Sequence, residues 1–442
     1  MRCLPYFLRA SRQLAFAVLV IGCQLLSSCF RPFVDTRKAK YHAIFTQPAP
    51  AADGIKTIRA FMAADGQLYP DALLASSAGL ANYHDCLLIN YYSDPANKAA
   101  LDTLIATHTL SAKAATLDAA VGTGELTAQA AIAAKLALVQ QALAKQKATE
   151  IKTALSGAAV PGAVPYLLIL IHGYNVGQVE HAADTRDATD PARRLAPRPY
   201  YAELRKALAP HWGSQPPAAI LEVYWDGLQK NVPIGIWKKG QGNARRTGLA
   251  LRQILASTDS STALRVLTHS SGGIVATHAF WNVTSPYSPG SRKYQVLNDT
   301  FNAYYKRWPT PTHRNVRLGM IVPAMPGIAF ADFANRTPQV QNSAIPPMSV
   351  IIGQNRNDYA VSKSGLAPGR FGATSLGCRY IQYADYVLPS CGSNAHLIDF
   401  AQDLSKASAQ PFRHGRGKLE EHSWYLYLKR PQFVDFARLL FN

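Results

Sequence analysis

An aliphatic run that ends in a serine and two glycines constrains this chain more than any other feature. Residues Leu264 to Leu267 are strand-like, Thr268-His269-Ser270-Ser271-Gly272-Gly273 follows, and Ile274-Val275 begins an apolar, helix-like stretch. Only small residues let a strand turn sharply into a helix that passes close to it. The pattern therefore predicts a strand, a tight turn and a helix, with Ser270 exposed on the turn.

The order of residues matches the G-x-S-x-G turn that carries a nucleophilic serine, except at its first position. Thr268 stands there instead of glycine and places a β-branched side chain where we expect the strand and helix to be closest. Ser271 is the other candidate nucleophile, but its window would begin with the bulky His269, so Ser270 is favoured. Alone, the pattern is equally typical of a glycine-rich turn with solvated serines.

A second apolar run supplies context for this turn. Pro165 to Ile171 is followed by His172-Gly173-Tyr174-Asn175, which predicts a buried parallel strand and an abrupt turn. In hydrolases with such a serine turn, a loop in this place and the residue after the serine donate two N–H groups to an oxyanion. Those residues would be Tyr174 and Ser271, and we expect His172 to brace the loop.

A carboxylate and a histidine complete the candidate constellation. Asp358 follows the apolar run Pro347 to Gly353, and a carboxylate just past a strand end suits a group that orients an imidazole. His422, ahead of the amphipathic stretch Phe433 to Phe441, is the predicted base. The alternatives that the sequence leaves open are Asp332, Asp385 and Asp399 for the acid, and His414 and His396 for the base.

These motifs resemble the α/β-hydrolase superfamily, and more narrowly an uncharacterised bacterial serine hydrolase group with His-Gly-aromatic-Asn, Trp-Asp and His-Ser-x-Gly-Gly motifs. Ile220 to Asp226 supplies the middle motif, and the resemblance covers roughly residues 160 to 442. It implies an α/β fold with a mostly parallel sheet and helices on both faces. It also implies a Ser270-His422-Asp358 triad that cleaves a carboxylic ester without a cofactor. A peptidase, and an inactive hydrolase-fold docking protein, are the competing functions.

The N-terminus predicts export and lipid attachment. Three arginines precede the apolar stretch Leu14 to Leu26, which is too short to span a bilayer and has the order of a secretory signal. Leu26-Ser27-Ser28-Cys29 resembles the lipobox of bacterial lipoproteins, which implies a lipid on Cys29. Phe30 then favours the periplasmic side of the outer membrane. The alternative is ordinary signal cleavage.

The formal charge of +19 predicts an anionic partner. Lipid headgroups suit an envelope protein, whereas nucleic acid is not expected, since no binding motif is present. We therefore expect membrane contact through the lipid and a basic surface, and an ester or lipid substrate. The basic residues gather at Lys230, Lys238, Lys239, Arg245, Arg246, Arg252, Lys406, Arg413, Arg416 and Lys418.

The cysteines that follow Cys29 suggest one bridge. Cys378 and Cys391 are close enough in sequence to pair in an oxidising compartment, and Cys86 is then expected as a buried thiol. No Cys/His spacing resembles a zinc site.

The chain divides into a signal peptide (1–28), a tether (29–56), N-terminal strands (57–97), a helical hairpin (98–156) and a catalytic domain (157–442). The first region would contain strands at Thr57 to Met62 and Cys86 to Tyr92. Two antiparallel helices would meet at Gly122-Thr123-Gly124 and serve as scaffold, with a lid or a surface for docking a protein partner as the alternatives. Val176 to Pro199 is the expected specificity loop. Further strands are predicted near residues 166, 220, 264, 316, 348 and 379.

Overall fold

The computed structural model describes residues 53–75, 87–157, 165–173, 200–212, 215–227, 237–283, 303–308, 310–313, 315–330, 348–362, 375–401, 422 and 424–441. Several expectations lie outside the described residues, among them the signal peptide, Cys29, Cys86 and the Val176–Pro199 loop.

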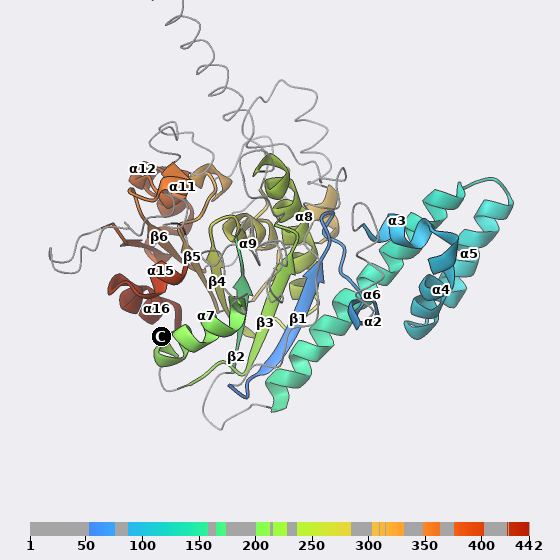
Figure 1. Cartoon of the computed structure of the whole chain (residues 1–442), viewed down its shortest axis with the longest axis horizontal. Helices are drawn as coiled ribbons and strands as arrows, with labels where there is room; N and C mark the ends of the chain where they lie inside the picture. The colour runs from blue at the N-terminus through green and yellow to red at the C-terminus, as the bar shows by residue number, and fades with distance from the viewer. Residues whose placement is uncertain are drawn as a thin grey trace, which may run out of the picture.

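A seven-stranded, all-parallel sheet forms the centre of the molecule, with the strand order β1-β3-β2-β4-β5-β6-β7 (Figure 1). The predicted α/β class is confirmed at this level. The strands are β1 (Lys56–Met62), β2 (Tyr166–Ile171), β3 (Ala219–Trp225), β4 (Ala263–His269), β5 (Val316–Ile321), β6 (Ser349–Gln354) and β7 (Ala395–Asp399).

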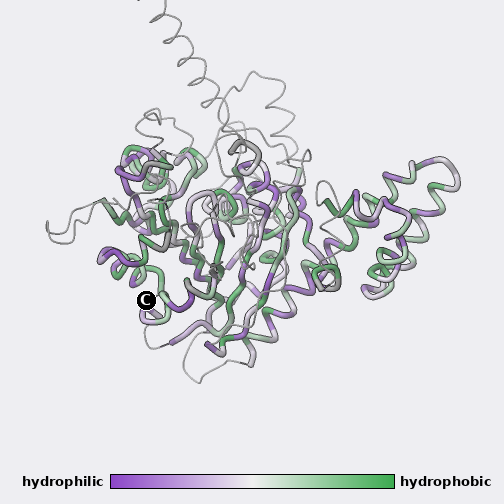
Figure 2. The backbone as a smooth tube through the Cα atoms, in the orientation of Figure 1, coloured by the Kyte–Doolittle hydropathy of each residue, from purple (hydrophilic) through white to green (hydrophobic). Residues whose placement is uncertain are grey.

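The central strands are buried along their whole length and are mostly apolar. Every residue of β2, β3 and β4 is buried, as expected of parallel strands covered on both faces. Figure 2 shows the hydrophobic residues gathered along these strands. The aliphatic runs seen in the sequence are therefore the centre of the core.

Helices cover both faces of the sheet. The helices are α2 (Asp71–Ala75), α3 (Leu88–Ser93), α4 (Lys98–Thr107), α5 (Ser111–Gly122), α6 (Ala128–Gly157), α7 (Tyr200–Leu208), α8 (Trp237–Ala256), α9 (Gly272–Phe280), α11 (Tyr359–Ser362), α12 (Tyr380–Gln382), α13 (Leu388–Cys391), α15 (Trp424–Leu428) and α16 (Gln432–Phe441). Shorter helical turns occupy Pro95–Asn97, Ala209–His211, Gly327–Phe330, Ser375–Gly377, Tyr383–Val387 and Gly392–Asn394.

Two adjacent residues of β5 show which helix lies on which face. Successive strand residues point to opposite faces. A Cβ on Gly319 would lie 2.9 Å from Phe436 of α16, whereas a Cβ on Gly273 of α9 would lie 3.6 Å from the Met320 sulfur. Helices α9 and α16 therefore cover opposite faces. Helix α8 packs closely on α9, because a Cβ on Gly248 would lie 2.5 Å from a carbonyl oxygen of α9.

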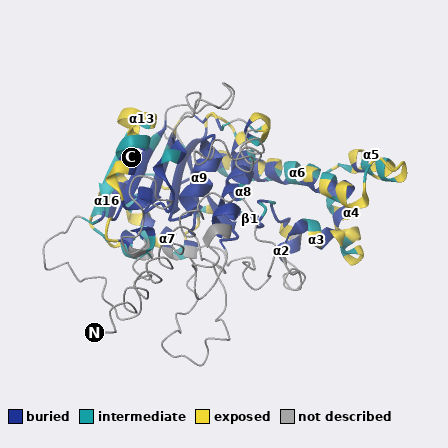
Figure 3. Cartoon of the chain, turned by 90° about the horizontal axis from the view of Figure 1, so that it is seen from above, coloured by how far each residue is buried: buried dark blue, intermediate teal, exposed yellow. Residues whose placement is uncertain are grey.

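A helical arm, formed by α3 to α6 (residues 88–157), extends from the β1 side of the sheet (Figure 1). Helix α6 contacts β1, β3 and α8, and it also contacts α3, α4 and α5. Exposed residues are prominent on α4 and α5, whereas α8, α9 and most of the sheet are buried (Figure 3). Two helices rather than one precede the Gly122 turn, and they meet at Thr109, where φ is +55°.

Two predicted strands are wrong. Where a strand was expected from Cys86 to Tyr92, residues Leu88 to Tyr92 lie in α3, in which Leu88, Tyr91 and Tyr92 are buried. This spacing of three and four residues places them on one helical face, which contacts α6. Residues near 379 form helical turns, because the buried Gln382 side chain accepts the Gly327 N–H at 2.8 Å and fixes a non-extended path.

The bridge predicted between Cys378 and Cys391 is not formed, since both are free thiols. Cys378 packs with Ala324 and Val361, while Cys391 packs against the main core. Burial raises the pKa of Cys391 to about 12, so its thiol stays protonated.

Two of the expected surface arginines are also buried. Arg252 is fully buried on α8 and donates to the carbonyl oxygens of Ala279 and Trp281, where α9 ends, and to that of Trp308. Arg245 is likewise buried, so neither contributes to a basic surface. None of the helices in the described parts of the chain has the length and apolar character needed to cross a membrane.

A buried ion cluster ties β1 to α7. The Arg205 side chain is 1% exposed, and it donates to Asp53 at 2.5 and 2.8 Å and to Glu222 at 3.0 Å. Glu222 also accepts from Arg59 and Tyr224. A buried charge of this kind is tolerated only while its partners remain.

We expect Arg205→Leu to lower the free energy of unfolding by roughly 3 kcal/mol or more, because Glu222 then loses its fully buried partner. Denaturant unfolding would measure the change. Arg438→Leu is the control: its pair with Asp435 is exposed on both sides and should contribute less than about 1 kcal/mol. Equal losses in the two variants would contradict a structural role for the cluster.

Candidate active site

The connections between successive strands diverge between β2 and β4. The chain passes from β2 to β3 on one side, and from β4 to β5 on the other, although β2 and β4 are neighbours. Ligands of open parallel sheets bind at the carboxyl ends of strands at such a point. The ends of β2 and β4 are His172-Gly173 and His269-Ser270, the two segments that the sequence singled out.

Ser270 occupies a strained turn between β4 and α9. Its φ is +53°, a region that residues other than glycine rarely adopt. The main chain is held there on both sides, since the Ser270 N–H donates to Ile321 and the Ser270 carbonyl accepts from Ala324. The predicted strand, turn and helix are all present. Ser270 is nevertheless only 3% exposed, because Gly173 and His422 lie against it.

Glycines allow the chain to close around this serine. A Cβ on Gly173 would lie 3.0 Å from the Ser270 Cβ, and a Cβ on Gly272 would lie 2.7 Å from two carbonyl oxygens at the end of β2. Thr268, expected at the closest approach, is instead accommodated within β4 between Ile171 and Met320. The tightest contact of the turn falls at Gly272.

Ser270, His422 and Asp358 form a continuous hydrogen-bonded chain. The Ser270 Oγ is 2.7 Å from His422 Nε2, and His422 Nδ1 is 2.8 Å from Asp358 Oδ2. Because a carboxylate only accepts, Nδ1 carries the proton and Nε2 faces the serine as an acceptor. This tautomer is the one in which an imidazole can take a proton from the serine.

The Asp358 carboxylate is fully buried and satisfied at both oxygens. Oδ1 accepts the Ala360 and Val361 N–H groups at 2.9 and 3.1 Å, and Oδ2 accepts from His422 and from the Tyr427 hydroxyl. Burial would raise the pKa of Asp358. The charge of His422 and these hydrogen bonds outweigh it, so that the pKa lies below its ordinary value. Asp358 therefore stays ionised beside the imidazole.

The other acids and histidines are placed differently. Asp399 caps its own turn by accepting the Ala401 N–H at 2.8 Å. Asp385 lies in the Tyr383–Val387 turn and His396 in β7. Asp332 and His414 lie outside the described residues.

His269 was not assigned a role from the sequence, yet it contacts the candidate base. The two rings lie 4.8 Å apart, and the His269 ring donates a hydrogen bond to the main chain of His422. Burial, and then the nearby His422 charge, lower the pKa of His269 well below its ordinary value. His269 is therefore a neutral support for the segment that carries His422.

His172 braces the neighbouring loop, as its position before a glycine suggested. Its Nδ1 donates to the Gly173 carbonyl at 2.8 Å, and its Nε2 accepts the Trp225 N–H at 3.2 Å. The Trp225 indole N–H donates to the His172 carbonyl at 2.9 Å, and the two rings are stacked. Burial lowers the pKa of His172 to about 4, so the ring stays neutral.

One of the two expected oxyanion donors, the Ser271 N–H, belongs to the described residues. The Ser271 N–H lies at the first turn of α9 and has no acceptor among the residues that the structure describes. A free N–H at a helix N-terminus attracts negative charge. Tyr174, the other expected donor, lies outside the described residues.

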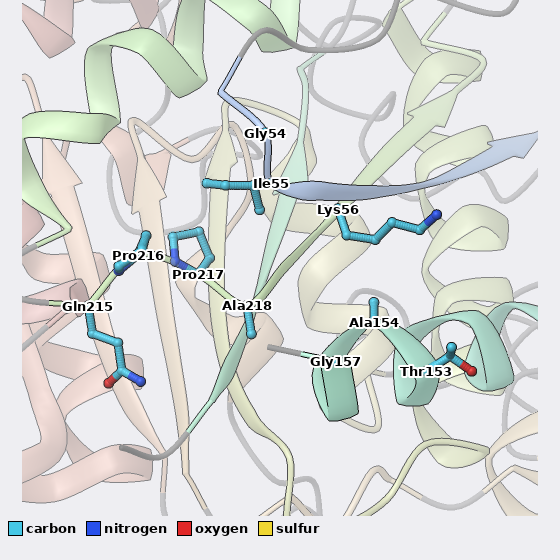
Figure 4. A pocket seen from close by; sticks show the side chains of 10 residues that line it. All are labelled: Gly54, Ile55, Lys56, Thr153, Ala154, Gly157, Gln215, Pro216, Pro217 and Ala218. Atoms are coloured by element: carbon cyan, nitrogen blue, oxygen red, sulfur yellow. The ribbon is translucent and has the colours of Figure 1, made fainter. Parts of the chain in front are cut away.

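In the described ranges, no group of three or more His, Cys, Asp or Glu side chains could hold a metal ion. A hollow of about 500 Å³ lies beside Lys56, Ala154 and Ala218, at the amino ends of β1 and β3 (Figure 4). It is at the opposite end of the strands from Ser270.

The positive φ of Ser270 has a measurable energetic consequence. We expect Ser270→Gly to be more stable to denaturant than Ser270→Ala by about 1 kcal/mol, because only alanine keeps the strain of a left-handed residue. The same pair of substitutions at the exposed Ser111, which starts α5, serves as the control. There glycine should be the less stable variant, and the same order at both positions would contradict the strain.

Comparison of the chain with protein-family models, with curated proteins and with solved structures finds no match.

Proposed function

We propose that this chain is a serine hydrolase with an α/β-hydrolase fold, and that it cleaves a carboxylic ester. The observation that carries the proposal is the hydrogen-bonded chain from Ser270 through His422 to Asp358, on a strained turn beside a free N–H. Each element has a recognised part in acyl transfer, and their arrangement together supports that reaction.

The proposed reaction has two halves. The Ser270 Oγ attacks the ester carbonyl carbon while His422 Nε2 takes its proton, and the carbonyl oxygen becomes an oxyanion near the Ser271 N–H. The oxyanion collapses, the alcohol leaves with the proton from His422, and an acyl-serine ester remains. Water then repeats the sequence and releases the acid. Asp358 stays charged throughout and favours the imidazolium that forms in each half.

The position in the fold supports the same reaction. The nucleophile, the N–H donor and the His172 loop lie at the carboxyl ends of β2 and β4, where the sheet connections part. The acid follows β6 and the base precedes α15, so the order along the chain is Ser, Asp, His. This order is that of the hydrolase superfamily named above.

The sequence also supports a setting for the proposed reaction. A signal with a lipobox and a positive net charge favours a lipid-anchored enzyme on the periplasmic side of the outer membrane. An ester of a lipid suits that location. The helical arm supplies a surface on which such an enzyme could be joined by a protein partner.

We expect the Ser270→Ala and His422→Ala variants to lose at least about 1,000-fold in hydrolysis of a short acyl ester and to escape labelling by a fluorophosphonate. The experiment uses the full-length protein. Ser271→Ala is the matched control, because it removes the neighbouring hydroxyl but leaves the main-chain N–H and should keep labelling.

Two outcomes would count against this proposal. A folded wild-type protein that takes no label would favour a docking protein with an inactive hydrolase fold. Labelling at Ser270 with cleavage of peptides but not of esters would make the protein a peptidase.

A further inference from the structure

We propose that Tyr427 is a positioning residue of the candidate triad, and that its hydroxyl sets how strongly Asp358 binds the His422 imidazole. The inference rests on the proposed function, since it assigns a further residue to the same site. Tyr427 lies on α15, five residues after His422, and no motif in the sequence singled it out.

The direction of the tyrosine hydroxyl is fixed by Asn355. The Asn355 Oδ1 accepts the Asn357 N–H at 3.0 Å, so its amide nitrogen is the atom that faces Tyr427. That nitrogen donates to the Tyr427 hydroxyl oxygen at 3.0 Å. The hydroxyl hydrogen is then directed to Asp358 Oδ2, at an O–O distance of 2.5 Å. The donor order therefore runs from Asn355 to Tyr427 to Asp358.

Two donors consequently share one carboxylate oxygen. Asp358 Oδ2 accepts from Tyr427 and from His422, while Oδ1 is already occupied by main-chain N–H groups. A second donor withdraws charge from the oxygen that faces the imidazole. It thereby weakens the preference of the site for a protonated His422.

The surroundings keep this donor in place. Tyr427 is fully buried, and its ring packs edge-on against Phe400 at 5.2 Å. Burial, and then the Asp358 charge, raise the pKa of Tyr427 well above its ordinary value, so the hydroxyl keeps its proton. The other titratable and charged groups that act on this cluster are His422, the neutral His269 on β4, and Arg430.

Removing the hydroxyl changes the site in a defined direction. In Tyr427→Phe the ring still fills its space, but Asp358 Oδ2 has only His422 as a donor. The carboxylate then holds the imidazolium more strongly, and the free base forms at a higher pH. We expect the acid limb of the fluorophosphonate labelling rate to move up by about half a pH unit or more. At pH values below the acid limb the rate should fall about threefold.

The test compares Tyr427→Phe with Tyr305→Phe in the full-length protein. Tyr305 is also buried and donates to a carbonyl oxygen, that of Val283, but it does not contact the triad. Loss of a buried hydroxyl alone would affect both variants equally and would leave the acid limb in place. Asn355→Ala, which frees the Tyr427 hydroxyl to turn, should move the acid limb in the same direction by a smaller amount.

A second measurement does not depend on activity. In a Ser270→Ala background, the NMR signal of the His422 Nδ1 proton reports its hydrogen bond to Asp358. Adding Tyr427→Phe should move this signal downfield, whereas adding Tyr305→Phe should not. If the wild type takes no label, the proposed hydrolase fails and this signal alone decides the inference. An unchanged acid limb in a labelled protein, or an unchanged proton signal in an unlabelled one, overturns it.

Discussion

The close approach of the chain at the ends of β2 and β4 is the constraint on which the rest of the site depends. Gly272 leaves no room for a side chain against the carbonyl oxygens at the end of β2, and Gly173 lies directly against Ser270. Two hydrogen bonds between His172 and Trp225 hold the end of β2 in the position that this close approach requires. The serine is thus forced into its left-handed conformation by packing that extends over three neighbouring strands.

The histidine and the carboxylate reach this serine from segments far along the chain, and each is held by more than its catalytic partner. The main chain of His422 accepts a hydrogen bond from His269. Asp358 accepts hydrogen bonds from the first N–H groups of α11 and from Tyr427. Such supporting contacts matter because a nucleophile and its base must stay within hydrogen-bond distance to act. The geometry of the triad therefore depends on residues that contact its members from outside the triad.

The parts of the fold that could be predicted from the sequence are those encoded by short local patterns of residues. Continuous aliphatic runs predicted β2, β4 and the turn at Ser270, and Asp358 was found because it follows such a run.

The parts of the fold that could not be predicted depend on contacts between residues far apart in the sequence. The segment near residue 379 is helical because Gln382 meets Gly327, and the pairing of Tyr427 with Asn355 joins residues with no motif between them. Leu88 to Tyr92 shows the remaining ambiguity, since a short apolar run fits a strand or one helical face.

The Arg205 cluster also determines how the fold responds to force. Arg205 holds Asp53 directly ahead of β1, and β1 is bonded to β3 along seven paired residues. We expect tension on the residues before Asp53 to load its ion pair with Arg205 first and then the pairing of β1 with β3. Two further strands, β3 and β2, separate β1 from β4, the strand that leads to Ser270.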